Sequence, residues 1–178
     1  MKYGAILCDP PWYWRAYSKK GEGRGAVQHY DCMSFDAIKA MREQIDRWAA
    51  ADCVLFLWAI DPMLPQALEL IDAWGFTYKT VGFYWVKTNR VAEGFSTGLG
   101  YWTRANPEQC LLATRGKPKR LSKSVRRLVV SPRREHSRKP DEVRRRIEQL
   151  VLGPYLELFA RSSQSGWDAW GNEAGLWR

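Results

Sequence analysis

An acid, two prolines and an aromatic ring stand together at Asp9-Pro10-Pro11-Trp12, directly after the apolar run 3–8. Because proline fixes φ and has no N–H to donate, a strand formed by that run must end at the acid. Ligands of open α/β sheets bind in the crevice beyond the carboxyl ends of the strands. These four residues are therefore predicted to lie at a ligand site.

The chemistry of this group suits a flat base that carries an exocyclic amine. The Asp9 carboxylate and the Pro10 carbonyl can each accept an amine N–H, and the Trp12 ring can stack on the base, a contact worth roughly 1–3 kcal/mol. Two acceptors would draw the delocalised nitrogen of an adenine amine toward tetrahedral geometry and free its lone pair. The alternative is a strand-ending turn with a core tryptophan; the order of the four residues favours the chemical role.

The motif [Asp/Asn/Ser]-Pro-Pro-[aromatic] is that of the amino-group methyltransferases, which modify adenine N6 or cytosine N4. Further blocks occur in the order found in one branch of that group, at residues 55–58, 85–89, 108–110, 137–142, 156–161 and 171–172. Together they resemble the catalytic domain of the eukaryotic mRNA adenosine N6-methyltransferase (MT-A70-like) and its bacterial and phage DNA adenine methyltransferase relatives. The resemblance extends over nearly the whole chain.

The resemblance implies S-adenosylmethionine as the cofactor. It implies that Lys139 pairs with the methionine carboxylate and that Asp9 receives the methionine amine as well as the target amine. The residues implied to hold the cofactor are Asp9, Lys139, Glu157, Arg161, Asn172 and Glu173. Without the family match, Lys139 would be interpreted as a surface lysine and Glu157 as a solvent-exposed residue at the end of a strand.

The chain departs from the family in three places. Glu173 stands where relatives often carry glutamine, and Ser163-Gln164 stands where they carry His-Asn. The sequence also begins at the motif strand, so the upstream segment that covers the cofactor adenine is not expected. These departures predict a modest cofactor affinity, or a partner chain that closes the pocket.

Contacts with the substrate are expected from two glycine-rich loops, 13–33 and 88–106, and from the basic segment 115–139. The expected substrate-binding residues are Tyr30, Lys87, Asn89, Glu108, Lys117, Lys119 and Arg120. A net charge of +9, from 28 Lys+Arg and 19 Asp+Glu, is typical of a protein that meets phosphates. A solvated basic face is the alternative for the basic segment.

The 178 residues suffice for one domain with a sizeable core. Strands are predicted at 3–8, 54–58, 77–86, 108–114 and 155–160, and helices over 35–49, from Asp61-Pro62 to Gly75 and from Pro140 onward. This alternation predicts a single α/β domain over 1–178, a Rossmann-like methyltransferase fold with a mainly parallel sheet. The catalytic motif precedes the cofactor motif, which is a permuted order.

Other classes of protein are not expected. No run approaches the ~20 apolar residues of a membrane span, and the four cysteines and two histidines lack metal-site spacing. Cys8, Cys53 and Cys110 are predicted to be buried thiols in a reducing cytoplasm.

The leading hypothesis is an enzyme that methylates adenine N6 in DNA, as restriction-modification and phage enzymes do. The alternatives are the same reaction on RNA and an inactive nucleic-acid-binding subunit. Intact Asp9 argues against the inactive subunit. No membrane partner is expected, and a homodimer stays open.

Overall fold

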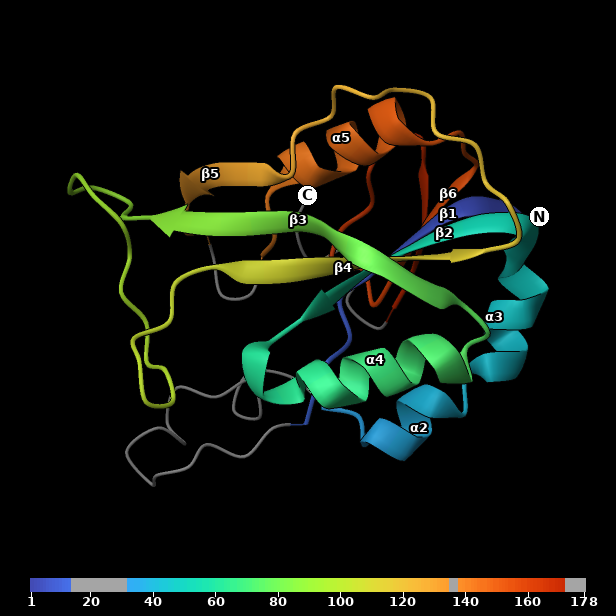
Figure 1. Cartoon of the computed structure of the whole chain (residues 1–178), viewed down its shortest axis with the longest axis horizontal. Coiled ribbons are helices and arrows are strands. Elements are labelled where there is room, and N and C mark those ends of the chain that lie inside the picture. The colour runs from blue at the N-terminus through green and yellow to red at the C-terminus, as the bar shows by residue number, and fades with distance from the viewer. Residues whose placement is uncertain (14–31, 135–137, 172–178) are drawn as a thin grey trace.

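The computed structural model describes residues 1–13, 32–134 and 138–171. Within this part of the chain, seven strands form one sheet in the order β5-β3-β4-β2-β1-β6-β7 (Figure 1). The strands are β1 (Tyr3–Cys8), β2 (Ala49–Ala59), β3 (Thr77–Thr88), β4 (Glu108–Arg115), β5 (Leu128–Pro132), β6 (Tyr155–Leu158) and β7 (Trp167–Trp170). All pairings are parallel except those of β4, which runs against both β2 and β3.

Helices cover both faces of the sheet (Figure 1). They are α2 (Phe35–Lys39), α3 (Arg42–Trp48), α4 (Leu64–Ala73) and α5 (Asp141–Leu150), with a 3-10 turn, η2 (Asp61–Met63), before α4. Ile38, Ile45 and Leu70 pack against one sheet face, whereas Val143 and Ile147 of α5 pack against the other. The predicted α/β architecture with a mainly parallel sheet, consistent with a Rossmann-like methyltransferase fold, is therefore confirmed.

Local sequence signals explain where several elements begin and end. The Ser34 hydroxyl accepts a hydrogen bond from the Ala37 N–H at 3.2 Å and so caps α2. Gly75, with φ of 74°, follows the end of α4 in a left-handed conformation that glycine adopts without strain. The expected single helix over 35–49 is wrong in one respect, because a turn at 40–41 divides it into α2 and α3.

Two strands were not predicted. β5 lies inside the basic segment 115–139 and pairs with β3 through Val129 and its neighbours, with Val129 buried under α5. β7 joins the sheet edge beside β6, where Trp167 is buried and stacks on Tyr155 at 4.9 Å between ring centroids. Both strands are only four or five residues long, so their periodicity is weak.

The topology collects the ends of many strands at one edge of the sheet. The carboxyl ends of β1, β2, β3, β5 and β6 lie there, together with the amino end of antiparallel β4. This edge is called the carboxyl edge below. Arg115, at the other end of β4, pairs with Cys53 near the start of β2 and so lies at the opposite edge.

Two further predictions concern the described residues. Cys8, Cys53 and Cys110 are buried free thiols, as predicted. None of the described helices has the length and apolar character needed to cross a membrane.

Candidate active site

The Asp9 carboxylate stands at the carboxyl edge, directly after β1. The two prolines that end the strand form a fixed turn: the Pro10 carbonyl accepts the Trp12 N–H at 2.8 Å, and the Pro11 carbonyl accepts the Met33 N–H at 3.1 Å. The predicted strand-ending turn is therefore present. It holds Asp9 in place while leaving its side chain 20% exposed.

Lys139 lies against Asp9, although 130 residues separate them. Its Nζ donates to both carboxylate oxygens, at 3.0 and 2.9 Å, and is 3.3 Å from the Glu108 carboxylate. The ammonium also lies over the Trp58 ring, 5.4 Å from the centroid, in cation–π geometry. The segment between β5 and α5 thus returns to the carboxyl edge and places a cation beside the motif acid.

Glu108, at the start of β4, is shared by two lysines. Besides Lys139, the Lys87 Nζ approaches the Glu108 carboxylate to 2.5 Å. Burial alone would raise the pKa of Glu108, but the Lys139 and Lys87 ammonium groups outweigh burial and lower it to about 2. The four side chains form an alternating chain of charges, called the charge chain below: Asp9, Lys139, Glu108 and Lys87.

The charge chain keeps Lys139 protonated. Burial would lower the pKa of Lys139, but the Asp9 and Glu108 carboxylates outweigh burial and raise that pKa. The Lys139 ammonium and the Glu108 carboxylate therefore stay charged near neutral pH. Charges paired in this way, with little solvent around them, hold one geometry.

A small cavity of about 30 Å³ opens beside the charge chain. Asp9, Lys139, Glu157 and Arg161 contribute to its lining. The structure therefore brings together the four described residues that the resemblance implied for the cofactor. Asn172 and Glu173, the other two, lie outside the described residues.

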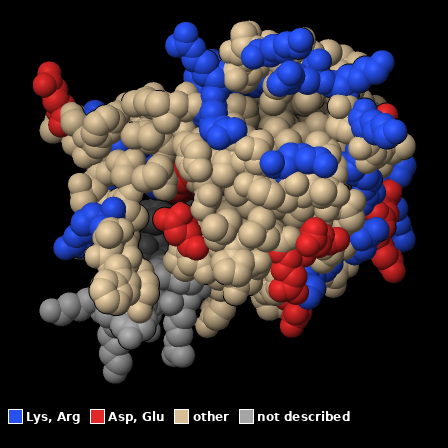
Figure 2. All heavy atoms as spheres, in the orientation of Figure 1, with Lys and Arg blue, Asp and Glu red and all other residues tan. Residues whose placement is uncertain are grey.

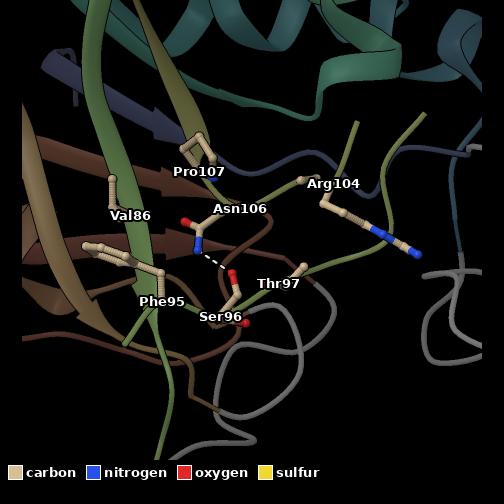
Figure 3. Close-up of a pocket in the computed structure, with 8 residues that line it drawn as sticks. Val86, Phe95, Ser96, Thr97, Arg104, Asn106 and Pro107 are labelled. Carbon is tan, nitrogen blue, oxygen red and sulfur yellow. Dashed lines mark hydrogen bonds between the residues drawn. The ribbon is translucent and has the colours of Figure 1, made fainter. Parts of the chain in front are cut away.

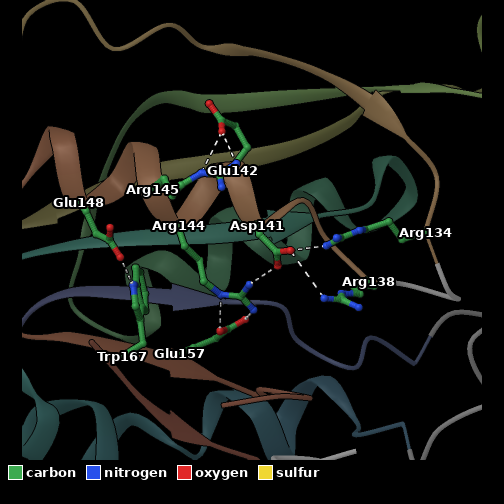
Figure 4. A network of polar contacts seen from close by, with 9 residues as sticks. All are labelled: Arg134, Arg138, Asp141, Glu142, Arg144, Arg145, Glu148, Glu157 and Trp167. Atoms are coloured by element: carbon green, nitrogen blue, oxygen red, sulfur yellow. Dashed lines mark hydrogen bonds and ion pairs between the residues drawn. The ribbon is translucent and has the colours of Figure 1, made fainter. Parts of the chain in front are cut away.

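Arg144 holds Glu157 with two parallel hydrogen bonds, of 2.8 and 2.9 Å (Figure 4). The same guanidinium donates to Asp141 at 2.8 Å, and Asp141 pairs in turn with Arg134 and Arg138. Burial, with a smaller contribution from Asp9, raises the pKa of Glu157 against the opposing effect of Arg144. Glu157 is thus an anchored carboxylate, not the solvated strand end of the alternative interpretation.

Arg144 is a site residue that the sequence did not single out. A usable signal was present, because an acid in the apolar strand 155–158 needs a buried cation, and Arg144 is three residues after Asp141 on a helix with an apolar stripe. Sequence alone does not show which of Arg144, Arg145 and Arg146 turns inward. The structure does: Arg145 and Arg146 pair with Glu142 instead.

Trp12 is placed in the core. Its ring is 5% exposed, and the indole N–H donates to the Trp58 carbonyl at 3.2 Å. This position matches the core-tryptophan alternative noted from the sequence. Stacking of Trp12 on a base stays a prediction, and it requires the ring to become accessible.

The expected substrate-binding residues separate into two regions. Lys87 and Glu108 belong to the charge chain, and Asn89 lies near it, where its side-chain amide donates to the Glu93 carbonyl at 3.2 Å and shapes the loop. Lys117, Lys119 and Arg120 follow the far end of β4, at the opposite edge. Tyr30 lies outside the described residues.

Comparisons with known proteins show which proteins this chain is similar to. A Mycoplasma protein named type II methyltransferase M.MunI is 33% identical over 188 residues, which cover 97% of this chain and 78% of that protein. A putative N(6)-adenosine-methyltransferase MT-A70-like of Medicago truncatula is 30% identical, and the human N(6)-adenosine-methyltransferase catalytic subunit METTL3 is 27% identical. The chain spans 26% and 28% of these two proteins.

The model of one protein family, described as MT-A70, matches residues 3–173. That range contains the motif turn, the charge chain and the anchored Glu157. Because the match covers nearly the whole chain, the protein belongs to the MT-A70 family of methyltransferases.

Proposed function

We propose that the protein transfers a methyl group from S-adenosylmethionine to the N6 amine of adenine in DNA. The observation that carries the proposal is the Asp9 carboxylate, which is fixed by a proline turn at the carboxyl edge, paired with Lys139 and still 20% exposed. A partly exposed carboxylate in a fixed position can accept the hydrogens of an amine that approaches from solvent.

The side chains around Asp9 match the charged end of the cofactor. The Lys139 ammonium can pair with a carboxylate, and Asp9 can pair with an ammonium, so the two suit the methionine zwitterion. S-adenosylmethionine supplies a methyl group on a sulfonium, a good leaving group. The cavity of about 30 Å³ is smaller than ligand pockets of about 300–1,000 Å³, so these residues supply only the polar end of a site.

The chain's own residues then act on the target amine in stated roles. Asp9 accepts one amine hydrogen. The Pro10 carbonyl, which already accepts the Trp12 N–H, has a second lone pair that can accept another. Lys139 fixes the direction of the Asp9 carboxylate, and Glu108 fixes Lys139. Donors and acceptors held in advance in this way cost no rearrangement when charge develops.

The choice of DNA follows the similarity to the Mycoplasma type II methyltransferase, of which the chain spans 78%. RNA is the second candidate, because relatives named N(6)-adenosine-methyltransferases also match 97% of the chain. An inactive subunit is disfavoured, since a binding role alone gives no reason to keep the Asp9 carboxylate in this fixed position.

The test is methyl transfer from labelled S-adenosylmethionine to matched DNA and RNA oligonucleotides, followed by identification of the modified nucleoside. We expect N6-methyladenine in DNA, and a transfer rate lower on the order of 10²–10³-fold for an Asp9→Ala variant, which lacks the acceptor. Transfer to RNA alone, or to cytosine, would overturn the proposed substrate. A folded parent without any transfer would favour the inactive subunit.

A further inference from the structure

The loop 88–106 is tied tightly to the end of β3. The Asn106 side chain accepts the Lys87 N–H and donates to the Lys87 carbonyl, both at 2.9 Å, and it also donates to the Ser96 carbonyl. The Ser96 N–H in turn donates to the Lys87 carbonyl at 2.8 Å. These bonds give the glycine-rich loop a defined shape.

That shape forms one wall of a second cavity, of about 310 Å³, which is largely open to solvent and separate from the small cavity beside Asp9. Figure 3 shows Val86 and Phe95 together on one side of it and Arg104 on the other, with Asn106 and Ser96 between them. The lining is mostly apolar, yet the Phe95 ring is 65% exposed. The volume falls in the range of ligand pockets.

The cavity adjoins the proposed active site through Lys87. The Lys87 backbone binds Asn106, which lines the cavity, while the Lys87 ammonium binds Glu108 in the charge chain. Glu108 reaches Asp9 through Lys139. A polymer whose target group lies at Asp9 therefore has its neighbouring units within reach of this cavity.

The groups at the cavity match an unpaired nucleotide. A phenyl ring and an aliphatic wall suit the face of a base, and a guanidinium suits the phosphate beside it. The rest of the loop adds Tyr101 and Trp102, which are 64% and 93% exposed, and Glu93 is the sole acid in the sequence 88–106. Both polar atoms of the Asn106 side chain already bind backbone groups, so a contact there favours no particular base.

Resting on the proposed function, we infer that this cavity holds an unpaired base adjacent to the target adenine. In this role Phe95 stacks on the base and Arg104 contacts its phosphate. The contact positions the strand relative to Asp9 and does not read its sequence. It also gives the loop 88–106 a role distinct from methyl transfer.

The test measures affinity for single-stranded DNA without cofactor, by fluorescence anisotropy. The DNA is a thymine strand with one adenine and, in a series of strands, one abasic position at each offset from that adenine. Phe95→Ala should weaken binding to the intact strand by about tenfold, a typical value for removal of one base–aromatic stack. At one offset, the abasic site should weaken DNA binding by the parent protein as much as Phe95→Ala does on the intact strand. On that abasic strand, the parent and the Phe95→Ala variant should bind with the same affinity.

Arg104→Ala should flatten the dependence of log affinity on log salt by about 0.7, the value for one phosphate contact on a single strand. Phe95→Ala should leave that slope unchanged, because stacking releases no counterions. Tyr78→Ala is the matched control, since Tyr78 is a 40% exposed aromatic at the opposite end of β3. It should alter neither affinity nor slope.

Additive effects of Phe95→Ala and the abasic site at every offset would overturn the inference. So would a change in oligomeric state of Phe95→Ala, measured by sedimentation, with DNA binding unchanged, because the loop would then be a protein interface. Methyl transfer in the same samples separates the two proposals. If Phe95→Ala and the abasic site are non-additive but no methyl is transferred, only the proposed function is wrong. If methyl is transferred but the two changes are additive at every offset, only this inference is wrong.

Discussion

The two ends of β4 carry charge in opposite ways. At its start, called the near end below, Glu108 is shared by Lys87 and Lys139, and all three side chains are 16–22% exposed. Beyond its end, called the far end below, Lys117, Lys119 and Arg120 are all exposed to solvent. Because a strand rises about 3.3 Å per residue, the eight residues of β4 hold these regions roughly 25 Å apart.

The difference shows that the same residue type, lysine, can have different roles depending on whether its charge is paired and shielded from solvent or exposed. Ion pairs with little solvent around them interact strongly and fix geometry, whereas exposed cations are screened by salt and act through their number. The near end of β4 is therefore suited to align one amine. The far end is suited to attract a polyanion, and Figure 2 shows Lys and Arg side chains gathered over the segment between β4 and β5 and over α5.

The largest effect is expected at the near end, from Asp9→Ala. Removal of a fixed electrostatic interaction with the reacting group should lower the methyl-transfer rate on the order of 10²–10³-fold. The measurement is single-turnover transfer at saturating DNA, with circular dichroism to verify the fold. Near-parental turnover by a folded variant would contradict the role of Asp9.

A second prediction concerns stability and pH at Glu108. The two lysines lower its folded-state pKa from 4.5 to about 2, so Glu108 stabilises the fold above pH ~4.5 and that stabilisation disappears as pH falls toward 2. Glu108→Gln should therefore be less stable at pH 7, by up to about 3 kcal/mol. The free energies of unfolding of the parent and of Glu108→Gln should become equal as the pH falls from about 5 to 2.

Urea unfolding at a series of pH values measures this difference. The control is Glu69→Gln, which removes a carboxylate that pairs with Lys39 at 2.6 Å and is 55% exposed. An exposed pair contributes about 0–1 kcal/mol, so its removal should change stability little at any pH. If the free energy of unfolding depends on pH in the same way in Glu108→Gln and Glu69→Gln, the ion pairs of Glu108 contribute no more to stability than an exposed ion pair.

A third prediction separates lysines at the two ends. Lys139→Ala should weaken S-adenosylmethionine binding in the absence of DNA by about tenfold or more, as removal of a hydrogen bond to a charged group does. Lys119→Ala, an exposed lysine at the far end, should leave that affinity unchanged. Calorimetry with each variant gives the comparison. If Lys139→Ala weakens only DNA binding, Lys139 belongs with the basic residues instead.

Much of the near end could be predicted from sequence, because its signals are local or follow from topology. Asp9 is marked by the strand before it and the prolines after it, and parallel strands must bring their carboxyl ends together. Trp12 shows the limit of this reasoning. A tryptophan beside such an acid has the same sequence signature whether its ring faces a ligand or, as Trp12 does with 5% exposure, the core.

The far end was harder to predict, because charge along a sequence does not give position in space. The run from Arg115 to Arg138 looks continuous, yet β5 divides it and carries its later part back to the carboxyl edge. Strand β5 alternates exposed Leu128 and Val130 with buried Val129, but only over five residues. The edge of the sheet at which the residues after β4 lie depends on β4 being antiparallel, and no local sequence signal specifies that orientation.

The smallest effect is expected from the triple variant in which Lys117, Lys119 and Arg120 are replaced by Ala. Gly116, with φ of 67°, and the bond from the Lys117 N–H to Asp52 at 2.7 Å fix the backbone there, so the fold should be unaffected. Binding to duplex DNA should weaken equally for all sequences, because phosphate contacts do not read bases. The log–log salt slope should flatten by about 0.9 for each phosphate that the variant no longer neutralises, with turnover at saturating DNA unchanged. A fall in turnover would place these cations beside the reacting base, and an unchanged slope would assign them to a solvated face.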